Sequence, residues 1–468
     1  MEDGIGDRAN EAGRNRFRCG AHDGSEKIMT SFADAVSPLQ RIFFHAFPAV
    51  ILSCSIGAAA PIKATVFAHY TTWFSLGESS DMHSWPPDEL PGKLTYALPR
   101  YPLLNDEGSP AFGTNHGYGG YNAIAPANMK RHIAWAKQYG IDVFAFLWDS
   151  QSGRFTQGID AFRTVNTDMP WIIFYDTLIR FGHLDVCVGS PFGSAHASCQ
   201  YDLGMKVRDG DVVKSLGQVM VDDFKNMQKN GWIDDPHYFR VEGRPVIWIF
   251  LASSFSDQSA TNPTARKWYD YLNDIRQWYW ENYHTEVFLV GDIAGPGMPY
   301  STTWDSYVTR FDATSGWSPY YPGCPRDPMC DCCRPRSLTD AVLPRIKSWA
   351  DAVPQKKITR ITGAQSATEF APFIMPQFDD QWGKGSSKPR MIATSKEDFR
   401  YMAEKLGRDL LHGRNWIFLS TFNAWPEATT VEPVCNWKYK NCEPDYSNDR
   451  GYYGFDFLEV IRDVFGGR

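Results

Sequence analysis

Eight short apolar runs are spaced along the chain after residue 60, and most are separated by segments with helical periodicity. The runs are rich in Val, Ile and Phe and are apolar continuously rather than at alternate positions. Continuous hydrophobicity is typical of strands that are buried on both faces, as in a parallel sheet. The expected strands are residues 62–70, 141–149, 171–176, 245–251, 286–292, 310–317, 370–379 and 415–422.

Six segments between and after these runs have apolar residues at i, i+3 and i+4 spacing, which predicts helices. Eight strands with intervening helices indicate the α/β class and a (β/α)8 TIM barrel with long βα loops, as a single domain over residues 61–468. A doubly wound sheet is the alternative, but the chain has no Gly-rich phosphate-binding turn. The expected helices are residues 127–140, 211–231, 265–283, 337–353, 395–413 and 455–465.

The first 60 residues have the composition of a targeting segment rather than of a folded domain. Residues 1–28 are polar and without pattern, which indicates a disordered or wrongly assigned start. Residues 29–60 contain "IFFHAFPAVILSCSIGAAAP", an apolar stretch followed by small residues, as a secretory signal peptide requires. An uncleaved membrane anchor or a lipid-modified Cys54 is the alternative. We therefore expect a secreted, periplasmic or cell-surface protein.

Cysteine usage agrees with export. Eight of the ten cysteines follow the expected cleavage region. Two pairs enclose short segments and predict disulfide bonds, Cys187 with Cys199 and Cys435 with Cys442. The cluster "CPRDPMCDCC" (residues 324–333) favours disulfides over a metal site, because its spacing differs from the C-x2-C pairs of structural zinc and no histidine is near.

Charge and composition narrow the class of ligand. The net charge is −7 and no long basic run occurs, which argues against nucleic acid as a partner, because phosphate binding needs clustered Lys and Arg. The chain has 17 Trp and 22 Tyr. Aromatic faces stack on the apolar C–H groups of sugar rings, so this composition suits a cleft that binds a polysaccharide or oligosaccharide.

Acidic and aromatic side chains follow most of the predicted strands. In (β/α)8 barrels the active groups gather at the C-terminal ends of the strands. Carboxylates there can perform acid–base chemistry and bind hydroxyl groups, although an aspartate can equally cap the next helix and a tryptophan can pack at the barrel rim. The predicted glycan-binding residues are His69, Tyr70, Trp73, Trp148, Asp149, Tyr175, Asp292, Trp317, Tyr320, Asp379, Asp380, Trp382, Asn423 and Trp425.

Five sequence blocks occur in order after residue 120: "YNAIAPANMKRHIAWAKQYGIDVFAFLW", "HYFRVEGRPVIWIF", "FDATSGWSPY", "MPQFDDQW" and "FNAWPEATTVEP". Together they resemble glycoside hydrolase family 99, the endo-α-mannosidases and endo-α-mannanases, and related domains of bacterial polysaccharide synthesis. The opening "VFAHY" is similar to the family 71 α-1,3-glucanases. The resemblance implies a (β/α)8 barrel, no metal or other cofactor, and retaining hydrolysis of α-glycosidic bonds.

The last-strand motif of that family is Asn-Glu-Trp-x-Glu-Gly, in which the second Glu is the acid/base and the first acts on the sugar 2-hydroxyl. By this resemblance Asn423 and Trp425 match, and Glu427 falls on the acid/base. The first Glu is replaced by Ala424 and the Gly by Ala428. A methyl group cannot accept a proton, so the family mechanism cannot operate unchanged.

Another carboxylate must therefore act with Glu427 if the site is hydrolytic. We expect Asp176, at the end of the third strand, and after it Asp379, Asp380 or Asp149. Two other functions remain open: a glycan-binding pseudoenzyme, and a protein of polysaccharide assembly.

Overall fold

The computed structural model describes the greater part of the chain after residue 62. All of these residues belong to one compact unit, Ala59–Arg468. The predicted polar start and signal segment, residues 1–60, lie outside the described residues. The described residues are 63–72, 100–102, 122–149, 153–184, 186, 200–257, 266–294, 299–319, 335–379, 391–392, 394–424, 429–436 and 454–466.

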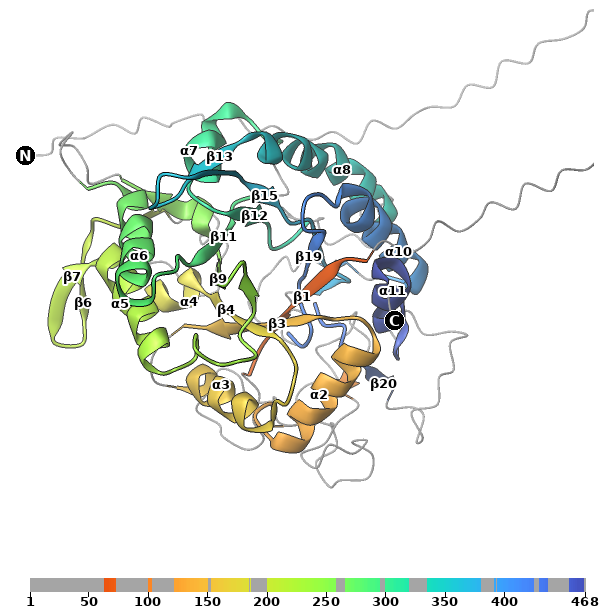
Figure 1. Cartoon of the computed structure of the whole chain (residues 1–468). Coiled ribbons are helices and arrows are strands. Elements are labelled where there is room, and N and C mark those ends of the chain that lie inside the picture. Colours follow the sequence, from red (N-terminus) through yellow and green to blue (C-terminus); the bar gives the residue numbers. More distant parts are fainter. Residues whose placement is uncertain are drawn as a thin grey trace, which may run out of the picture. The chain divides into compact units, whose positions relative to one another are not determined.

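A parallel sheet occupies the centre of this unit, and helices surround it (Figure 1). Its hydrogen-bonded order is β15-β12-β11-β9-β4-β3-β1-β19-β16. Each adjacent pair in this order is parallel. Its strands are β1 (Thr65–Tyr70), β3 (Val143–Trp148), β4 (Trp171–Tyr175), β9 (Arg244–Ile249), β11 (Phe288–Asp292), β12 (Ala313–Ser315), β15 (Glu369–Phe370), β16 (Phe373–Ile374) and β19 (Trp416–Leu419).

The two ends of this order are halves of one interrupted strand. β15 pairs with β12, and β16 pairs with β19. In the gap between them, the Ala371 N–H donates to the Thr314 carbonyl at 2.8 Å, and the Pro372 carbonyl accepts from Phe418 N–H at 2.8 Å. Residues 369–374 thus connect the two edges and form the seventh of eight strand positions. The predicted eight-stranded parallel barrel is confirmed.

Each strand position is followed by at least one helix, and Figure 1 shows the helices outside the ring of strands. Side chains of a strand alternate between the barrel interior and this helix layer, which is why the strands are apolar on both faces. The helices are α2 (Pro126–Gln138), α3 (Arg154–Val165), α4 (Thr177–Gly182), α5 (Leu216–Lys229), α6 (Trp268–Tyr283), α7 (Asp305–Val308), α8 (Pro335–Ala352), α10 (Lys396–Met402) and α11 (Asp456–Phe465).

Two predicted helices differ from the observed ones. The segment 211–231 begins as a strand, β7 (Val212–Ser215), which pairs with β6 (Lys206–Asp209) before Ser215 caps α5. The segment 395–413 is an α-helix only through α10 and continues as a π turn (Ala403–Gly407) and a 3-10 turn (Arg408–Leu410). Gly407 lies so close to the Phe465 ring that a β-carbon there would approach it to 2.7 Å, and this close approach to α11 coincides with the change of helix type.

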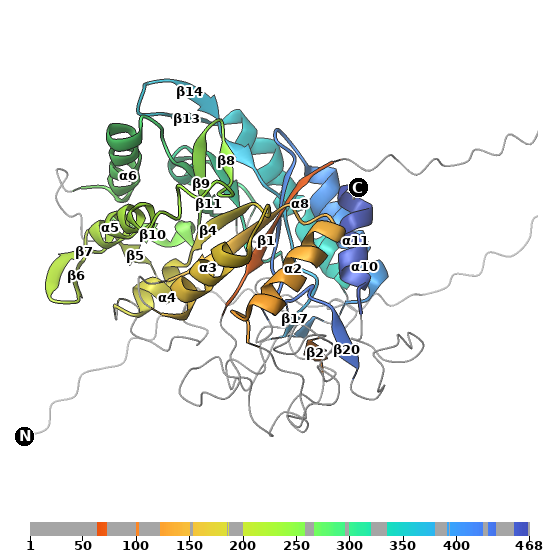
Figure 2. The same ribbon diagram turned by 60° about the horizontal axis from the view of Figure 1, so that its bottom comes forward.

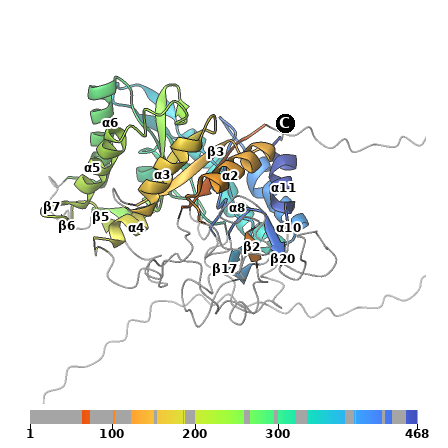
Figure 3. The ribbon, with the colours of Figure 1, turned by 90° about the horizontal axis from the view of Figure 1, so that it is seen from below.

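Short strands mark the two ends of the barrel (Figure 2). β8 (Arg240–Val241), β13 (Lys357–Thr359) and β14 (Gln365–Ala367) lie at the N-terminal end of the barrel strands. β17 (Phe378–Asp379) pairs with β18 (Met391–Ile392) at the other end, and β2 (Arg100–Pro102) pairs with β20 (Val434–Asn436) there, as Figure 3 also shows. The remaining pair is β5 (Tyr201–Asp202) with β10 (Phe255–Ser256).

Aromatic rings fill the barrel interior. Trp248 stacks on Phe418 with ring centroids 4.3 Å apart, and Phe67 lies 4.9 Å from Trp416. Closer to the C-terminal ends of the strands, Phe174 lies 5.6 Å from Trp317. The interior is therefore a packed core, and any ligand site must lie at its ends. Among the described helices, none has the length and apolar character needed to span a membrane.

Candidate active site

Two aspartates lie side by side at the C-terminal ends of adjacent strands. Trp148 of β3 is the register partner of Tyr175 of β4, so the residues that follow them, Asp149 and Asp176, are neighbours. Both are buried, with 4% and 5% of their surface exposed. Asp176 accepts a hydrogen bond from the Ile179 N–H at 2.9 Å and caps α4. Asp176 therefore caps α4 and also lies at the barrel mouth.

Asp292 is a third carboxylate at this level of the barrel. It ends β11 and accepts hydrogen bonds from the backbone N–H groups of Leu251, at 3.2 Å, and Trp317. Burial raises its pKa to about 7, and the two backbone hydrogen bonds oppose that rise only in part. A carboxyl group with this pKa exchanges a proton near neutral pH, as an acid–base group must.

His69 lies inside the barrel below the mouth. Its ring contacts Phe174 and Trp317 edge-on, with centroids 4.6 Å and 4.7 Å away. Burial lowers the pKa of His69 to about 3, so the imidazole is neutral at physiological pH. Neither ring nitrogen has a hydrogen-bond partner among the described residues. A neutral imidazole can donate one hydrogen bond and accept another, which suits a sugar hydroxyl.

Trp317 connects His69 to the rim. The residue is half-buried, its ring lies 5.3 Å from the Phe250 ring, and its backbone carbonyl accepts from the Ser420 hydroxyl at 2.6 Å. The backbone of Trp317 is therefore held by Ser420, the residue that follows β19, while the residue as a whole is only half-buried.

Three other predicted binding residues contact the helix layer. The Tyr70 hydroxyl lies 2.8 Å from His132 Nδ1 in α2, and the Tyr175 hydroxyl donates to Asp223 in α5 at 2.9 Å. Trp148 stacks on Tyr175 at 5.6 Å. Side chains alternate along a strand, so each of these residues faces away from the mouth residue next to it in the sequence. The neighbouring pairs are Tyr70 with His69, Tyr175 with Asp176, and Trp148 with Asp149. Their contacts are those of packing between sheet and helices.

Asn423 and Ala424 follow the last barrel strand. The Asn423 side chain accepts from the Thr71 N–H and donates to the Thr71 carbonyl, both at 2.8 Å. Ala424 is buried, and its N–H donates to the Thr421 hydroxyl at 2.8 Å. The position at which the resembled family has its first glutamate is thus a methyl group in a packed environment.

Several predicted residues, or their side chains, lie outside the part of the chain that the structure describes. Asp379 lies in β17 and Cys435 in β20, but their side chains are not described. The residues outside the described ranges are Trp73, Tyr320, Asp380, Trp382, Trp425, Glu427, Cys187, Cys199 and Cys442.

The structure also reveals a buried chain of polar groups that the sequence did not indicate. His132 Nε2 lies 3.2 Å from Glu432 Oε1, and His132 Nδ1 meets the Tyr70 hydroxyl. All three side chains are buried. The three residues are up to 362 positions apart in the sequence, so no local pattern could have associated them. The contact between His132 and Glu432 joins the segment after Glu427 to α2.

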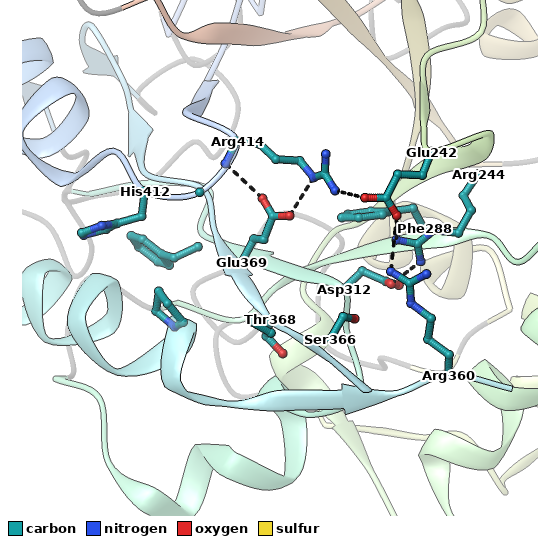
Figure 4. A pocket seen from close by; sticks show the side chains of 14 residues that line it. Glu242, Arg244, Phe288, Asp312, Arg360, Ser366, Thr368, Glu369, His412 and Arg414 are labelled. Carbon is teal, nitrogen blue, oxygen red and sulfur yellow. Dashed lines mark hydrogen bonds and ion pairs between the residues drawn. The ribbon is translucent and has the colours of Figure 1, made fainter. Parts of the chain in front are cut away.

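A charged pocket of about 300 Å³ lies at the opposite end of the barrel (Figure 4). Arg244, Phe288 and Glu369 are the first residues of β9, β11 and β15, which places the pocket at the N-terminal ends of the strands. Arg414 bridges Glu242 and Glu369 at 2.5 Å and 2.7 Å. In (β/α)8 barrels this end contributes to stability and the C-terminal end carries the chemistry. The candidate site is therefore the C-terminal mouth, at which Asp149, Asp176, Asp292 and His69 lie.

Comparison with known proteins gives one family and several solved structures. Residues 221–444 match the family model described as "Glycosyltransferase WbsX". No curated protein matches the chain. A solved structure named "Glycoside hydrolase-like protein" superimposes with a TM-score of 0.55 at 16% sequence identity, covering 88% of this chain and 97% of its own.

Two structures of the GH99 endo-alpha-mannosidase from Bacteroides thetaiotaomicron match with a TM-score of 0.46. Their identities are 14% and 15%, and each alignment covers 86% of this chain and 96% of theirs. The WbsX match and the glycoside hydrolase-like structure confirm the predicted resemblance to glycoside hydrolase-like barrels and domains of polysaccharide synthesis. The chain is similar to the WbsX glycosyltransferase family over residues 221–444 and shares its barrel fold with a glycoside hydrolase-like protein.

Proposed function

We propose that this protein acts on glycans at the C-terminal mouth of its barrel and that it hydrolyses an α-glycosidic linkage of a polysaccharide or oligosaccharide. The observation that carries the proposal is the set of three buried carboxylates at the C-terminal ends of barrel strands, Asp149, Asp176 and Asp292, together with the neutral imidazole of His69 at the same end of β1. Glycoside cleavage requires a pair of carboxyl groups for proton transfer or nucleophilic attack, and the neutral His69 and the half-buried Trp317 suit contacts with sugar hydroxyls and rings. The family and structural matches support the same substrate class.

In this proposal Glu427 donates a proton to the glycosidic oxygen as the bond to the leaving sugar breaks. Asp176 is the partner carboxylate. It either attacks the anomeric carbon, which gives a covalent intermediate that water then hydrolyses, or removes a proton from the attacking water. A separation of about 5–5.5 Å between the carboxyl groups corresponds to the first course and about 6.5–9.5 Å to the second.

Glycosyl transfer is the second candidate, and the match to the WbsX family favours it. The alanine at position 424 also favours it, because it removes the group that the resembled hydrolases use on the 2-hydroxyl. In transfer, a sugar hydroxyl takes the place of water as the acceptor, and the same mouth carboxylate removes its proton. Export to the periplasm or cell surface is part of either proposal and is supported by the signal-like segment 29–60.

The test is turnover by Glu427→Gln and Asp176→Asn on α-mannans and α-glucans, with products and anomeric configuration followed by NMR. Asparagine caps a helix as well as aspartate does, so Asp176→Asn preserves the start of α4 while it removes the charge. We expect each variant to lose at least about 100-fold in rate, and Glu427→Gln to retain glycan binding. Glu281→Gln, on the exposed side of α6, is the control.

Products decide between the two candidates. Shortened chains and free reducing ends indicate hydrolysis, whereas extended chains formed with an added acceptor oligosaccharide indicate transfer. Unchanged turnover in both variants would refute the assigned roles, and binding without any product would leave the protein a glycan binder.

A further inference from the structure

We propose that the charged pocket at the N-terminal end of the barrel binds a small phosphate monoester, and that the Glu242 carboxylate competes with the phosphate for the same arginines. The pocket has a volume of about 300 Å³, at the lower end of the range for small-molecule sites. It lies at the opposite end of the barrel from the mouth, so this inference does not depend on the proposed function.

Three guanidinium groups converge on the Glu242 carboxylate (Figure 4). Arg414 Nη2 donates to Glu242 Oε1 at 2.5 Å. The Nη2 atoms of Arg360 and Arg244 lie 3.6 Å and 3.9 Å from Glu242 Oε2, which permits charge attraction but is too far for a hydrogen bond. Among the described residues, the Glu242 carboxylate therefore attracts three cations and forms a hydrogen bond with only one of them.

Arg360 has hydrogen-bond donors that no described residue accepts. Its side chain lines the pocket, points toward Glu242 in Figure 4 and is 23% exposed. Within the part of the chain that the structure describes, its guanidinium forms no hydrogen bond and only the long ion pair with Glu242. A guanidinium group offers five N–H donors in a planar fork, which matches the oxygens of a phosphate. Arg360 is therefore placed to bind an anion that comes closer than Glu242 does.

The balance of charge in the pocket indicates a dianion. When the Glu242 side chain turns away, four guanidinium groups face two carboxylates, an excess of two positive charges. A phosphate monoester carries about −1.5 to −2 at neutral pH and restores neutrality. A single carboxylate carries no more charge than Glu242, which also has the advantage of being tethered next to the arginines. The groups counted are Arg244, Arg276, Arg360 and Arg414 with Asp312 and Glu369, and the remaining titratable group that lines the pocket is His412.

The backbone at Glu242 supports an exchange of its side chain for a ligand. Val241 and Arg244 are register partners, so Glu242 and Gly243 form a two-residue hairpin turn with φ values of +53° and +79°. Asparagine followed by glycine is the usual pair in such a turn, and a glutamate with positive φ is unfavourable. The Glu242 side chain is 53% exposed, so it can turn outward into solvent. A glutamate at this turn is thus suited to the arginines rather than to the backbone.

The rest of the pocket fits a compact organic group. Phe288 and Phe370 line it and are each 2% exposed. The Arg244 guanidinium lies 4.6 Å from the centre of the Phe288 ring, and Pro354 adds a further apolar surface. Aromatic and apolar groups suit the C–H groups of a sugar ring. The ligand class that we infer is therefore a hexose phosphate or another phosphate monoester of similar size.

Calorimetric titration of the full chain at low ionic strength tests this assignment, with glucose 6-phosphate, glucose and glucuronate as probes. Arg360→Gln should weaken binding of glucose 6-phosphate at least about 10-fold, because it removes a charged donor. Glu242→Asn should tighten that binding at least about threefold, because asparagine suits the turn and leaves the arginines to the ligand. Glucose should show neither change, because it lacks the phosphate. Glucuronate, with one carboxylate, should bind at least about 10-fold more weakly than glucose 6-phosphate.

The control variants remove the same charges elsewhere on the surface. Arg131→Gln on α2 and Glu281→Gln on α6 alter exposed residues that do not line the pocket, so affinity should stay within about twofold of wild type. The melting temperature of each variant shows whether it folds. Arg360→Gln should keep the wild-type value, because a partly exposed ion pair at 3.6 Å contributes little to stability.

A role in stability alone predicts that neither Arg360→Gln nor Glu242→Asn changes the affinity, and that result would overturn the inference. The absence of binding heat for glucose 6-phosphate up to about 10 mM, in both wild type and Glu242→Asn, would overturn it as well. Glucuronate binding as tight as that of glucose 6-phosphate would refute the phosphate class. None of these results bears on turnover at the mouth, so a failure here leaves the proposed glycan function standing.

Discussion

Asn423 holds both backbone polar groups of Thr71, accepting from its N–H and donating to its carbonyl at 2.8 Å each. This pair joins the chain just beyond the first barrel strand to the chain just beyond the last. The asparagine that the resemblance placed in the catalytic motif thus fixes the start of the segment that carries Trp425 and Glu427.

Replacing Asn423 should therefore affect both stability and activity. In Asn423→Asp the donor becomes a second acceptor facing the Thr71 carbonyl, so we expect the free energy of unfolding to fall by about 2 kcal/mol or more. Denaturant titration measures this change, and turnover on the glycan substrate should fall with it. Asn282→Asp, at an exposed position of α6, is the control. A loss below about 0.5 kcal/mol would contradict the structural role.

Asp292 should make stability depend on pH in an unusual direction. Its pKa in the folded chain is about 7, above its ordinary value of 3.8, so the folded state binds the proton more tightly than the unfolded state does. The stabilisation from this group is complete below pH 3.8 and is lost as the pH rises through 7.

The variant Asp292→Asn removes that dependence and keeps an acceptor for the Leu251 and Trp317 N–H groups. We expect its stability relative to wild type to improve by about 2–3 kcal/mol between pH 5 and pH 8, at 1.36 kcal/mol per pH unit. Unfolding titrations at the two values check this, with Asp351→Asn on the exposed side of α8 as a control for the loss of one charge. An unchanged difference across the range would mean that Asp292 is ionised throughout.

Glu432 should be essential for the buried chain that includes His132 and Tyr70. Glu432→Ala leaves the buried imidazole without its carboxylate, and we expect a loss of about 3 kcal/mol in the free energy of unfolding. Tyr70→Phe removes only the terminal hydroxyl and should cost about 1 kcal/mol. If the three groups act as a unit, the double variant will lose less than the sum of the two single losses. Additive losses would show that the contacts are independent.

Asp312 should dominate stability at the N-terminal end of the barrel. It is buried between Arg244, at 2.5 Å, and Arg276, at 3.2 Å. Burial alone would raise its pKa, but the two guanidinium groups outweigh that effect and lower it. Because the pKa is lowered, the stabilisation is present above pH 3.8 and is lost as the pH falls below it.

Asp312→Asn should therefore cost about 3–5 kcal/mol at pH 7, since it leaves two buried cations without their partner. Arg414→Ala, which breaks the more exposed pairs with Glu242 and Glu369, should cost no more than about 1 kcal/mol. Chemical denaturation of both variants gives the comparison. If the two variants lose similar amounts of unfolding free energy, then burial does not make the Asp312 ion pairs more important for stability than the Arg414 ion pairs.

The barrel was predictable because each strand can be recognised from its own short stretch of sequence. Runs such as residues 141–149 are apolar at every position, which only burial on both faces explains, and eight such runs determine the architecture. Helix ends were less predictable. Val212 and Val213 carry the apolar spacing of a helix but lie exposed in the β6–β7 hairpin, where the turn at Gly210 overrides that spacing.

The candidate site was predictable only in part. Strand ends placed Asp149, Asp176 and Asp292 at the C-terminal face of the barrel, since that follows from the fold alone. The sequence could not show on which side of its strand Tyr70 or Tyr175 lies, because a continuous apolar run does not distinguish the interior from the helix layer. It also could not show that the ring nitrogens of His69 lack partners among the described residues, since an unpaired atom is a property of the packed chain.

The interruption at Ala371–Pro372 leaves the seventh barrel strand with few pairing positions. β3 and β4 share five register positions, whereas β15 and β16 each share two with their neighbours, and Pro372 has no amide hydrogen to contribute. Native-state fluctuations will open the wall first along this seam, and deuterium will enter there before it reaches β3 or β4. The seam leads into residues 375–379 at the C-terminal end of the barrel, so this side of the mouth is joined to the least extensively paired part of the barrel wall.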